Sequence, residues 1–351
     1  MAYIADKGEC AKILFVEAEE WERTKLVEKC GCGEDVPWTA KRFENLTDGE
    51  IPDGTQILSP FVESDLSADQ LRRVPELKLV ATRTTGYDHI DLDYCNENGI
   101  VVSNVPDYGD NTVAEHTFAL ILALTRKIPQ TYDRVIRGNF DIGGLRGIDL
   151  RGRTFGAIGA GNIAQHALRI AVGFSMRAIA FDIQPREELA REIGFEYVDM
   201  DQLLRDSDIV SLHVPYNEHT HHLIDADAME KMKDTAILIN TARGGIVDPQ
   251  ALLEALRSGK LGGAGLDVLE AEHAIGEEAE LLSSSFDTDK LTNIVRSHAL
   301  MRMDNVVITP HMAFNSEEAV LRIIETTVEN IHRFLEDKPQ NVVNDPQGVE
   351  V

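Results

Sequence analysis

Residues 154–168 read Thr-Phe-Gly-Ala-Ile-Gly-Ala-Gly-Asn-Ile-Ala-Gln-His-Ala-Leu. An apolar run ends at Gly159, and Gly161 precedes apolar residues at helical spacing, which is typical of a strand, a tight turn and a helix. Glycines in such a turn let the backbone approach a pyrophosphate, whose charge meets the free N–H groups at the start of the helix. The third position of this fingerprint is Ala164, which is small enough for the helix to pack closely on the strand.

A second apolar run, residues 176–181, ends at Asp182, about twenty residues after the glycine turn. A carboxylate at this point can accept hydrogen bonds from the ribose hydroxyls of an adenosine. A glycine-rich turn in some other α/β protein is the alternative. The combination of strand, Gly-x-Gly turn, helix, strand and acid favours a dinucleotide site.

Apolar strand patterns alternate with charged helical patterns along the chain, and this alternation predicts parallel sheets. We expect an α/β protein with two domains. Residues 109–309 would form a Rossmann-type doubly wound parallel sheet that binds the dinucleotide. Residues 1–108 and 310–351 would form a smaller, flavodoxin-like α/β domain that binds the substrate, so the chain would cross between the domains twice.

The helix predicted over residues 112–128 is apolar around most of its circumference. The pattern Thr112-x-x-Glu115 predicts a capping box at its start. Such a helix is expected to be buried, either between domains or in a subunit interface. We therefore expect a homodimer that pairs through this region.

The composition indicates a globular chain of 351 residues with 43% hydrophobic residues and a net charge of −26. The charge argues against nucleic acid and acidic membranes as partners, but it does not exclude an anionic substrate. There is no apolar run of about 18 residues, the start lacks the core of a signal peptide, and the few cysteines suit a reducing compartment. We expect a cytoplasmic protein, whose acidity reflects either a high-salt habitat or an ordinary acidic surface.

No metal site is predicted. Cys30-Gly-Cys32 has no matching second pair of cysteines. His219-x-His221-His222 could suggest a metal ligand set, but we interpret it as a loop between a strand and a helix.

Three polar residues stand where strand patterns end, namely Arg243, Glu272 and His311. The carboxyl ends of strands face the ligand crevice in doubly wound sheets. Arginine can hold a carboxylate with two hydrogen bonds, and histidine can exchange a proton near neutral pH, aided by a neighbouring carboxylate. For each residue alone, a surface ion pair or a helix cap is the competing interpretation.

Four motifs in this order resemble the D-isomer-specific 2-hydroxyacid dehydrogenases over most of the chain. The motifs are the glycine turn with Asp182, the arginine motif 240–248, the glutamate motif 266–272 and the histidine motif 309–311. The family often has proline after the glutamate, where this chain has His273, and glycine where it has Ala164. Neither departure removes a functional group.

The resemblance implies that Arg243, Glu272 and His311 are catalytic, with Glu272 pairing with His311. It implies that the N–H groups of Thr85 and Gly86 bind the substrate carboxylate. It also implies that the NAD site is lined by Gly159, Gly161, Asn162, Ile163, Asp182, Val214, Pro215, Thr241, Ala242 and Asp267.

Tyr108 and Phe314 look like the aromatics of the D-lactate dehydrogenase branch, where they would close on a small substrate side chain. We therefore expect reversible, NAD-dependent reduction of a 2-keto acid to the D-2-hydroxy acid, with pyruvate as the first choice. Glyoxylate, hydroxypyruvate and bulkier 2-keto acids are the alternatives. An NAD-sensing protein similar to the corepressors of this fold is a further alternative from another class.

Overall fold

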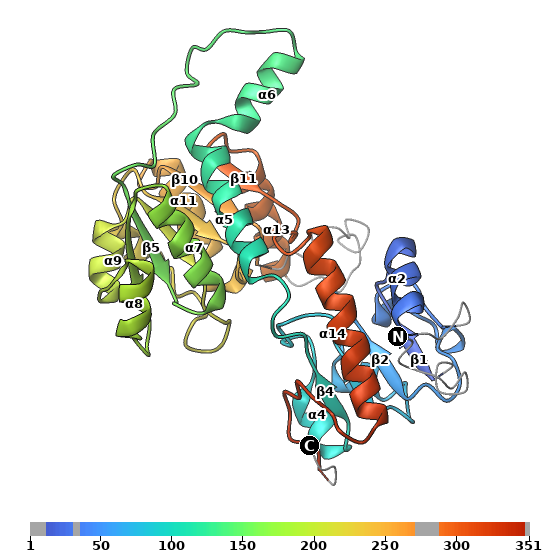
Figure 1. Cartoon of the computed structure of the whole chain (residues 1–351). Coiled ribbons are helices and arrows are strands. Elements are labelled where there is room, and N and C mark those ends of the chain that lie inside the picture. The colour runs from blue at the N-terminus through green and yellow to red at the C-terminus, as the bar shows by residue number, and fades with distance from the viewer. Residues whose placement is uncertain (1–11, 31–35, 271–287, 348–351) are drawn as a thin grey trace. The chain divides into compact units, whose positions relative to one another are not determined.

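The computed structural model describes residues 12–30, 36–270 and 288–347. The chain divides into two compact units (Figure 1). One comprises Met1–Tyr108 with Ser316–Val351, and the larger one comprises Gly109–Asn315. The chain thus returns to the first unit at Ser316, later than the expected residue 310. Among the described residues, none of the helices combines the length and the apolar character needed to span a membrane.

The larger unit contains one sheet of seven parallel strands, in the order β11-β10-β9-β8-β5-β6-β7. The strand order reverses between β5 and β8, which is the switch point where doubly wound sheets bind ligands. This confirms the predicted Rossmann-type sheet. The strands are β5 (Thr154–Ile158), β6 (Arg177–Phe181), β7 (Glu196–Tyr197), β8 (Ile209–Leu212), β9 (Ile237–Asn240), β10 (Gly263–Leu266) and β11 (Val306–Ile308).

Helices cover both faces of this sheet, as Figure 1 shows. The near-continuous burial of the strands follows, because side chains on both faces are withdrawn from water. One face is covered by α5 (Asp110–Thr125), α7 (Asn162–Gly173) and α8 (Glu187–Ile193). The other face is covered by α9 (Met200–Asp206), α10 (Ala226–Lys231), α11 (Pro249–Ser258) and α13 (Thr288–Met301).

The start of α5 differs from the prediction. The helix is preceded by Gly109, and Thr112 is a buried residue inside the first turn rather than its cap. The apolar faces of α5 are used within the larger unit, where Phe118 stacks on Phe155 and Phe174. Exposed apolar side chains lie instead on α6 (Ile128–Ile136) and the segment after it: Ile128, Tyr132, Val135, Ile136, Phe140 and Ile142.

The smaller unit contains four parallel strands in the order β1-β2-β3-β4. A further parallel bridge joins Phe15 to Trp38 beyond β1. The strands are β1 (Ile13–Phe15), β2 (Ile57–Ser59), β3 (Leu79–Ala81) and β4 (Val101–Ser103). The helices are α2 (Glu20–Cys30), α3 (Ala68–Leu71), α4 (Leu92–Glu97) and α14 (Glu317–Leu335), with 3-10 turns at Phe43–Asn45 and Asp48–Glu50.

The helix α14 joins this unit from the far end of the sequence, packing against α2 and β3. It is capped by Ser316, whose side chain accepts a hydrogen bond from the Ala319 amide. Its residue Asn330 is fully buried and donates to the carbonyl of Asn104. The smaller unit therefore includes the last helix as part of its own core.

Candidate active site

Three neighbouring strands of the larger unit end at the same level. Leu266 at the end of β10 is paired with Asn240 of β9 and with Ile308 of β11. Arg243 is the third residue after the end of β9, and His311 is the third residue after the end of β11. The fold therefore brings the arginine and histidine motifs to one edge of the sheet. Glu272 lies outside the described residues.

The backbone next to Arg243 is held by the buried side-chain amide of Asn240, for which the sequence predicted no role. Asn240 has 1% of its surface exposed, and its Nδ2 donates to the Arg243 carbonyl at 2.8 Å. Its Oδ1 accepts from the Ala242 amide at 3.0 Å. Since both ends of this amide are bonded to the same turn, Asn240 determines where the arginine side chain starts.

The loop that carries His311 is held by Asp267, the residue after β10. The Asp267 carbonyl accepts from the His311 amide at 2.8 Å. Its carboxylate accepts from the amides of Met312 and Ala313, at 2.9 and 2.8 Å, and from the Thr309 hydroxyl. These bonds keep the histidine loop in the larger unit, which explains why the chain leaves it only after Asn315.

His311 itself has a φ of 50°, in the left-handed region. Histidine tolerates that region better than most residues do. The Thr309 hydroxyl next to it also meets Nε2 of His116, a half-buried residue of α5, at 3.0 Å. The position of the histidine thus depends on α5, β10 and β11 together.

Burial would by itself raise the pKa of the Asp267 carboxyl. Hydrogen bonds from His116, Thr309 and the two loop amides outweigh it and hold the pKa below its usual value. A lowered pKa means that Asp267 contributes to stability fully above its unfolded-state pKa, about 3.9, and that the contribution is lost as the pH falls below it.

Asp267→Asn is expected to destabilise the chain by about 1–3 kcal/mol, because an NH₂ group would replace one oxygen and face a backbone donor. Urea unfolding at neutral pH measures this cost. The difference between wild type and variant should shrink on acidification towards pH 3, as the wild-type carboxylate becomes protonated. A difference that stays constant over that range would contradict the assigned role of the charge.

The glycine turn after β5 has the form that a pyrophosphate requires. Gly159 has a φ of 92°, and a Cβ there would lie 2.4 Å from the His213 carbonyl oxygen. Gly161 precedes α7, and a Cβ there would meet no protein atom within 4 Å. The first glycine is thus required by the fold, while the second leaves space open above the N-terminus of a twelve-residue helix.

Asp182 follows β6, as the sequence predicted for a ribose-binding acid. Its Oδ2 accepts from the Ala160 amide at 2.8 Å and its Oδ1 from the Gln184 amide at 2.8 Å. Arg186 donates to the Ala160 carbonyl at 2.7 Å, so a cation lies at the same turn.

The other predicted cofactor residues also follow strand ends. Asn162 and Ile163 begin α7, Val214 and Pro215 follow β8, and Thr241 and Ala242 follow β9. In a doubly wound sheet these positions surround the crevice that takes a dinucleotide. The residues present therefore suit NAD.

In the smaller unit, the loop after β3 is held by hydrogen bonds that use its carbonyls and side chains. Asn104 Nδ2 donates to the Thr85 carbonyl at 2.8 Å, and Thr84 Oγ1 donates to the Gly86 carbonyl at 2.6 Å. Within the described part of the chain, the N–H groups of Thr85 and Gly86 have no acceptor. Donors of this kind can bind an anion.

Two predicted aromatics belong to different units. Tyr108 ends the first segment of the smaller unit, and its carbonyl accepts from Arg322 Nε of α14 at 2.6 Å. Phe314 lies in the larger unit, on the loop held by Asp267. The sequence-based boundary at residue 310 had assigned Phe314 to the smaller unit.

Residues 118–313 match the family model of the D-isomer specific 2-hydroxyacid dehydrogenase, NAD binding domain, which is more than half of the chain. The chain belongs to this family. The resemblance predicted from the four motifs is thereby confirmed, and the chain is an NAD-dependent D-2-hydroxyacid dehydrogenase.

Named relatives agree with this placement. The dehydrogenase is 40% identical over 262 residues to an aromatic 2-oxoacid reductase of Clostridium sporogenes, covering 74% of this chain and 76% of the relative. It is 37% identical to a D-lactate dehydrogenase of Escherichia coli, covering 79% of this chain and 83% of the relative. The crystal structure of D-lactate dehydrogenase from Aquifex aeolicus, complexed with NAD and lactic acid, superposes with a TM-score of 0.81 at 36% identity, covering 93% and 96% of the chains.

Proposed function

We propose that this dehydrogenase reduces pyruvate to D-lactate with NADH, and runs the reverse reaction when D-lactate and NAD⁺ are supplied. The observation that carries the proposal is the pair Arg243 and His311, each three residues past the end of a strand, on strands that flank β10. The similarity to D-lactate dehydrogenases supports pyruvate as the substrate.

In this proposal Arg243 binds the substrate carboxylate with two hydrogen bonds and polarises the keto oxygen. Bound NADH supplies the hydride. His311 donates its proton to the keto oxygen as the alcohol forms, and accepts that proton in the reverse direction. Glu272, by resemblance, pairs with His311. The N–H groups of Thr85 and Gly86 are the proposed further partners of the carboxylate.

The NAD site in this proposal uses the turn at Gly159 and Gly161, whose missing side chains make room for the pyrophosphate. Asp182 would accept from the adenosine ribose. The residues around the crevice would complete the site: Asn162, Ile163, Val214, Pro215, Thr241, Ala242 and Asp267.

Pyruvate is expected to be reduced with a higher kcat/KM than phenylpyruvate, because Tyr108 and Phe314 would leave room for only a small side chain. Phe314→Ala should shift the ratio towards phenylpyruvate by at least about tenfold, the effect of a 1.4 kcal/mol change in transition-state binding. Steady-state kinetics with NADH and a panel of 2-oxo acids, including glyoxylate and hydroxypyruvate, measures this.

Aromatic 2-oxo acids are the second candidate substrates, because relatives 40% identical to this chain are aromatic 2-oxoacid reductases. A wild type that prefers phenylpyruvate would replace pyruvate by this candidate and leave the family unchanged. Binding of NADH without turnover of any 2-oxo acid would instead favour an NAD-sensing protein.

NADH is expected to exceed NADPH at least about tenfold in kcat/KM, since the Asp182 carboxylate repels a 2′-phosphate. Asp182→Asn keeps an acceptor for the Ala160 amide but removes the charge, and should lower the ratio of kcat/KM with NADH to kcat/KM with NADPH. Arg186→Ala is the matched variant on the same turn, and it should raise this ratio because it removes a cation. Equal efficiency of the wild type with both cofactors would refute the preference.

Pairing of two copies remains a proposal. The expected interface was the 112–128 helix region, whose α5 residues are largely used by the core of the larger unit. The exposed apolar side chains at its end and beyond, from Ile128 to Ile142, make α6 the better candidate for the dimer contact.

A further inference from the structure

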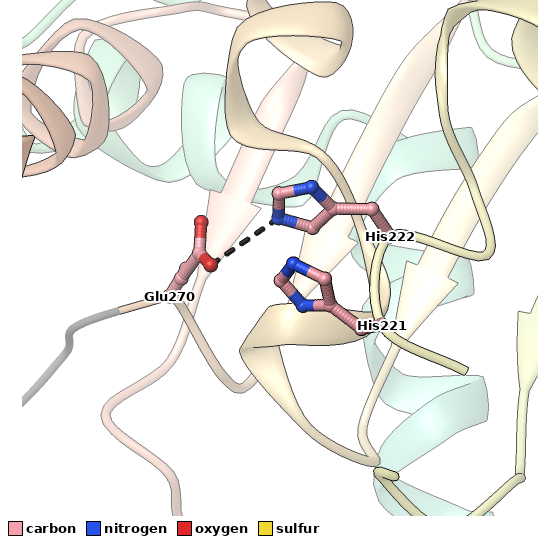
Figure 2. A group of neighbouring side chains, drawn as sticks. All are labelled: His221, His222 and Glu270. Carbon is pink, nitrogen blue, oxygen red and sulfur yellow. Dashed lines mark hydrogen bonds and ion pairs between the residues drawn. The ribbon is translucent and has the colours of Figure 1, made fainter. Parts of the chain in front are cut away.

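A cluster of two imidazoles and a carboxylate contains none of the proposed catalytic residues Arg243, Glu272 and His311. His221 and His222 belong to the loop between β8 and α10, and Glu270 follows β10. Figure 2 shows both rings and the Glu270 carboxylate facing one another. His222 Nε2 lies 3.2 Å from Glu270 Oε1, and among the described residues one nitrogen or oxygen of each of the three lies within 4.8 Å of the others.

The fold holds the two segments together through a pair of glycines. The His222 amide donates to the Gly245 carbonyl at 2.8 Å. A Cβ on Gly244 would lie 2.2 Å from the Leu269 carbonyl carbon and 2.4 Å from the Glu270 nitrogen. The loop with His221 and His222 and the segment with Glu270 therefore lie on either side of the Gly244–Gly245 backbone, where Gly244 has no room for a side chain.

Hydrogen bonds within the loop hold His221 and His222 in place. The His221 amide donates to the Asn217 carbonyl at 2.9 Å, and Thr220 Oγ1 donates to the Pro215 carbonyl at 2.7 Å. His222 has a φ of 48°, so the backbone turns sharply between the two histidines and the rings stack with centroids 3.9 Å apart. Adjacent side chains thus point the same way, which an extended strand would prevent.

One nitrogen of His221 already has a partner. Its Nδ1 lies 3.1 Å from the Tyr216 hydroxyl. Histidines that bind metals commonly use the second ring nitrogen in such a bond, which orients the ring and leaves the other nitrogen for the ion. For His221 that nitrogen is Nε2.

We propose that His221, His222 and Glu270 bind one Zn²⁺ ion, with water as the fourth ligand. Two imidazoles and a carboxylate are a ligand set that zinc accepts. Bonds of about 2.0–2.1 Å in a tetrahedron place two ligand atoms roughly 3.3 Å apart. The separation of 3.2 Å between His222 Nε2 and Glu270 Oε1 matches this edge. His221 is exposed, so its ring can tilt towards the ion.

The described cysteines do not compete for the ion. Cys30 and Cys95 are buried, and burial raises the pKa of each thiol to about 12, so neither supplies a thiolate near neutral pH. The competing interpretation is that His222 and Glu270 form only a hydrogen bond and that the His221 ring stacks on His222.

Calorimetric titration of the full chain with ZnCl₂, after metal removal and without substrate or NADH, tests the site independently of the proposed reaction. The wild type is expected to bind one ion per chain at this site. His221→Ala and Glu270→Gln should each weaken that binding at least tenfold. His219→Ala is the matched control, since His219 is in the same loop with a side chain 85% exposed, and should leave binding unchanged.

Two further measurements decide between outcomes. Zn²⁺ should raise the melting temperature of the wild type and of His219→Ala more than that of the two ligand variants, because an ion that binds only the folded chain stabilises it. Co²⁺ in place of Zn²⁺ should show tetrahedral absorption without a thiolate charge-transfer band. No binding at one ion per chain, equal binding by all variants, or a thiolate band would each overturn the proposal.

Discussion

Replacing His311 by glutamine is expected to lower kcat for pyruvate reduction by roughly 10²–10⁴-fold, the usual contribution of a positioned general acid. Glutamine can form a hydrogen bond but cannot give up a proton. NADH binding should persist, because none of the residues proposed to hold NAD is changed. Steady-state kinetics and fluorescence titration with NADH measure the two quantities separately.

His311→Asn is the second variant for this test, because asparagine tolerates the left-handed backbone found at residue 311 better than glutamine does. If both variants lose turnover and keep NADH, the loss comes from the missing proton donor and not from a strained loop. A variant that keeps more than a tenth of the wild-type kcat would contradict the role.

The pH dependence provides a signature for the same residue. Reduction needs the protonated imidazole and oxidation needs the neutral one, so kcat/KM should fall with rising pH for pyruvate and rise for D-lactate. Glu272→Gln should move both profiles to lower pH, since the favourable negative charge is lost. Superimposable profiles for wild type and Glu272→Gln would show that this glutamate does not act on the histidine.

Arg243→Gln is expected to lower kcat/KM for pyruvate by roughly 10²–10³-fold, comparable to the loss of one preorganised donor at a developing oxyanion. The guanidinium would contact both the carboxylate and the keto oxygen, so binding and carbonyl polarisation should both suffer. NADH affinity and the shape of the pH profile should stay as in wild type. The measurement is kcat/KM with pyruvate at saturating NADH.

Arg243→Lys is the matched control, because it keeps the charge and loses the two-pronged hydrogen bond. Its activity should fall between those of wild type and Arg243→Gln. If lysine restores wild-type activity, charge alone is sufficient and the bidentate contact is refuted. If glutamine has no effect, Arg243 does not touch the substrate.

Local signals in the sequence predicted much of the larger unit. The helix α11 begins and ends at short-range signals, with Asp248 accepting from the amides of Gln250 and Ala251, and with Gly259 in the left-handed region at its end. These signals act within one turn of chain, so the sequence displays them directly. The doubly wound sheet followed from buried strands between such helices.

Other features depend on contacts between distant segments and could not be predicted. Asp267 was expected at the NAD site because of its motif, but its carboxylate is bonded to residues 309–313 of the next strand's loop. Asn240 begins the arginine motif, but no pattern in the sequence shows that both ends of its amide hold the turn at Arg243. Neither role has a short-range pattern.

The cluster of His221, His222 and Glu270 also could not be predicted from the sequence. The sequence contains neighbouring histidines, but the third group of the cluster, Glu270, is 48 residues from His222. No spacing rule for metal ligands joins residues that far apart in this way. Only the pairing of β8, β9 and β10 brings them together.

A mutational scan should give different results at the two glycines of the cofactor turn, Gly159 and Gly161. At Gly159 an alanine collides with the protein's own backbone, so a survey scored by soluble yield should reject it before any cofactor is added. At Gly161 an alanine collides with nothing in the chain, so this variant should be obtained in normal soluble yield. Only a selection for growth that depends on the dehydrogenase reaction should eliminate it. Two glycines of one motif would thus be preserved by different selective pressures, Gly159 by folding and Gly161 by ligand binding.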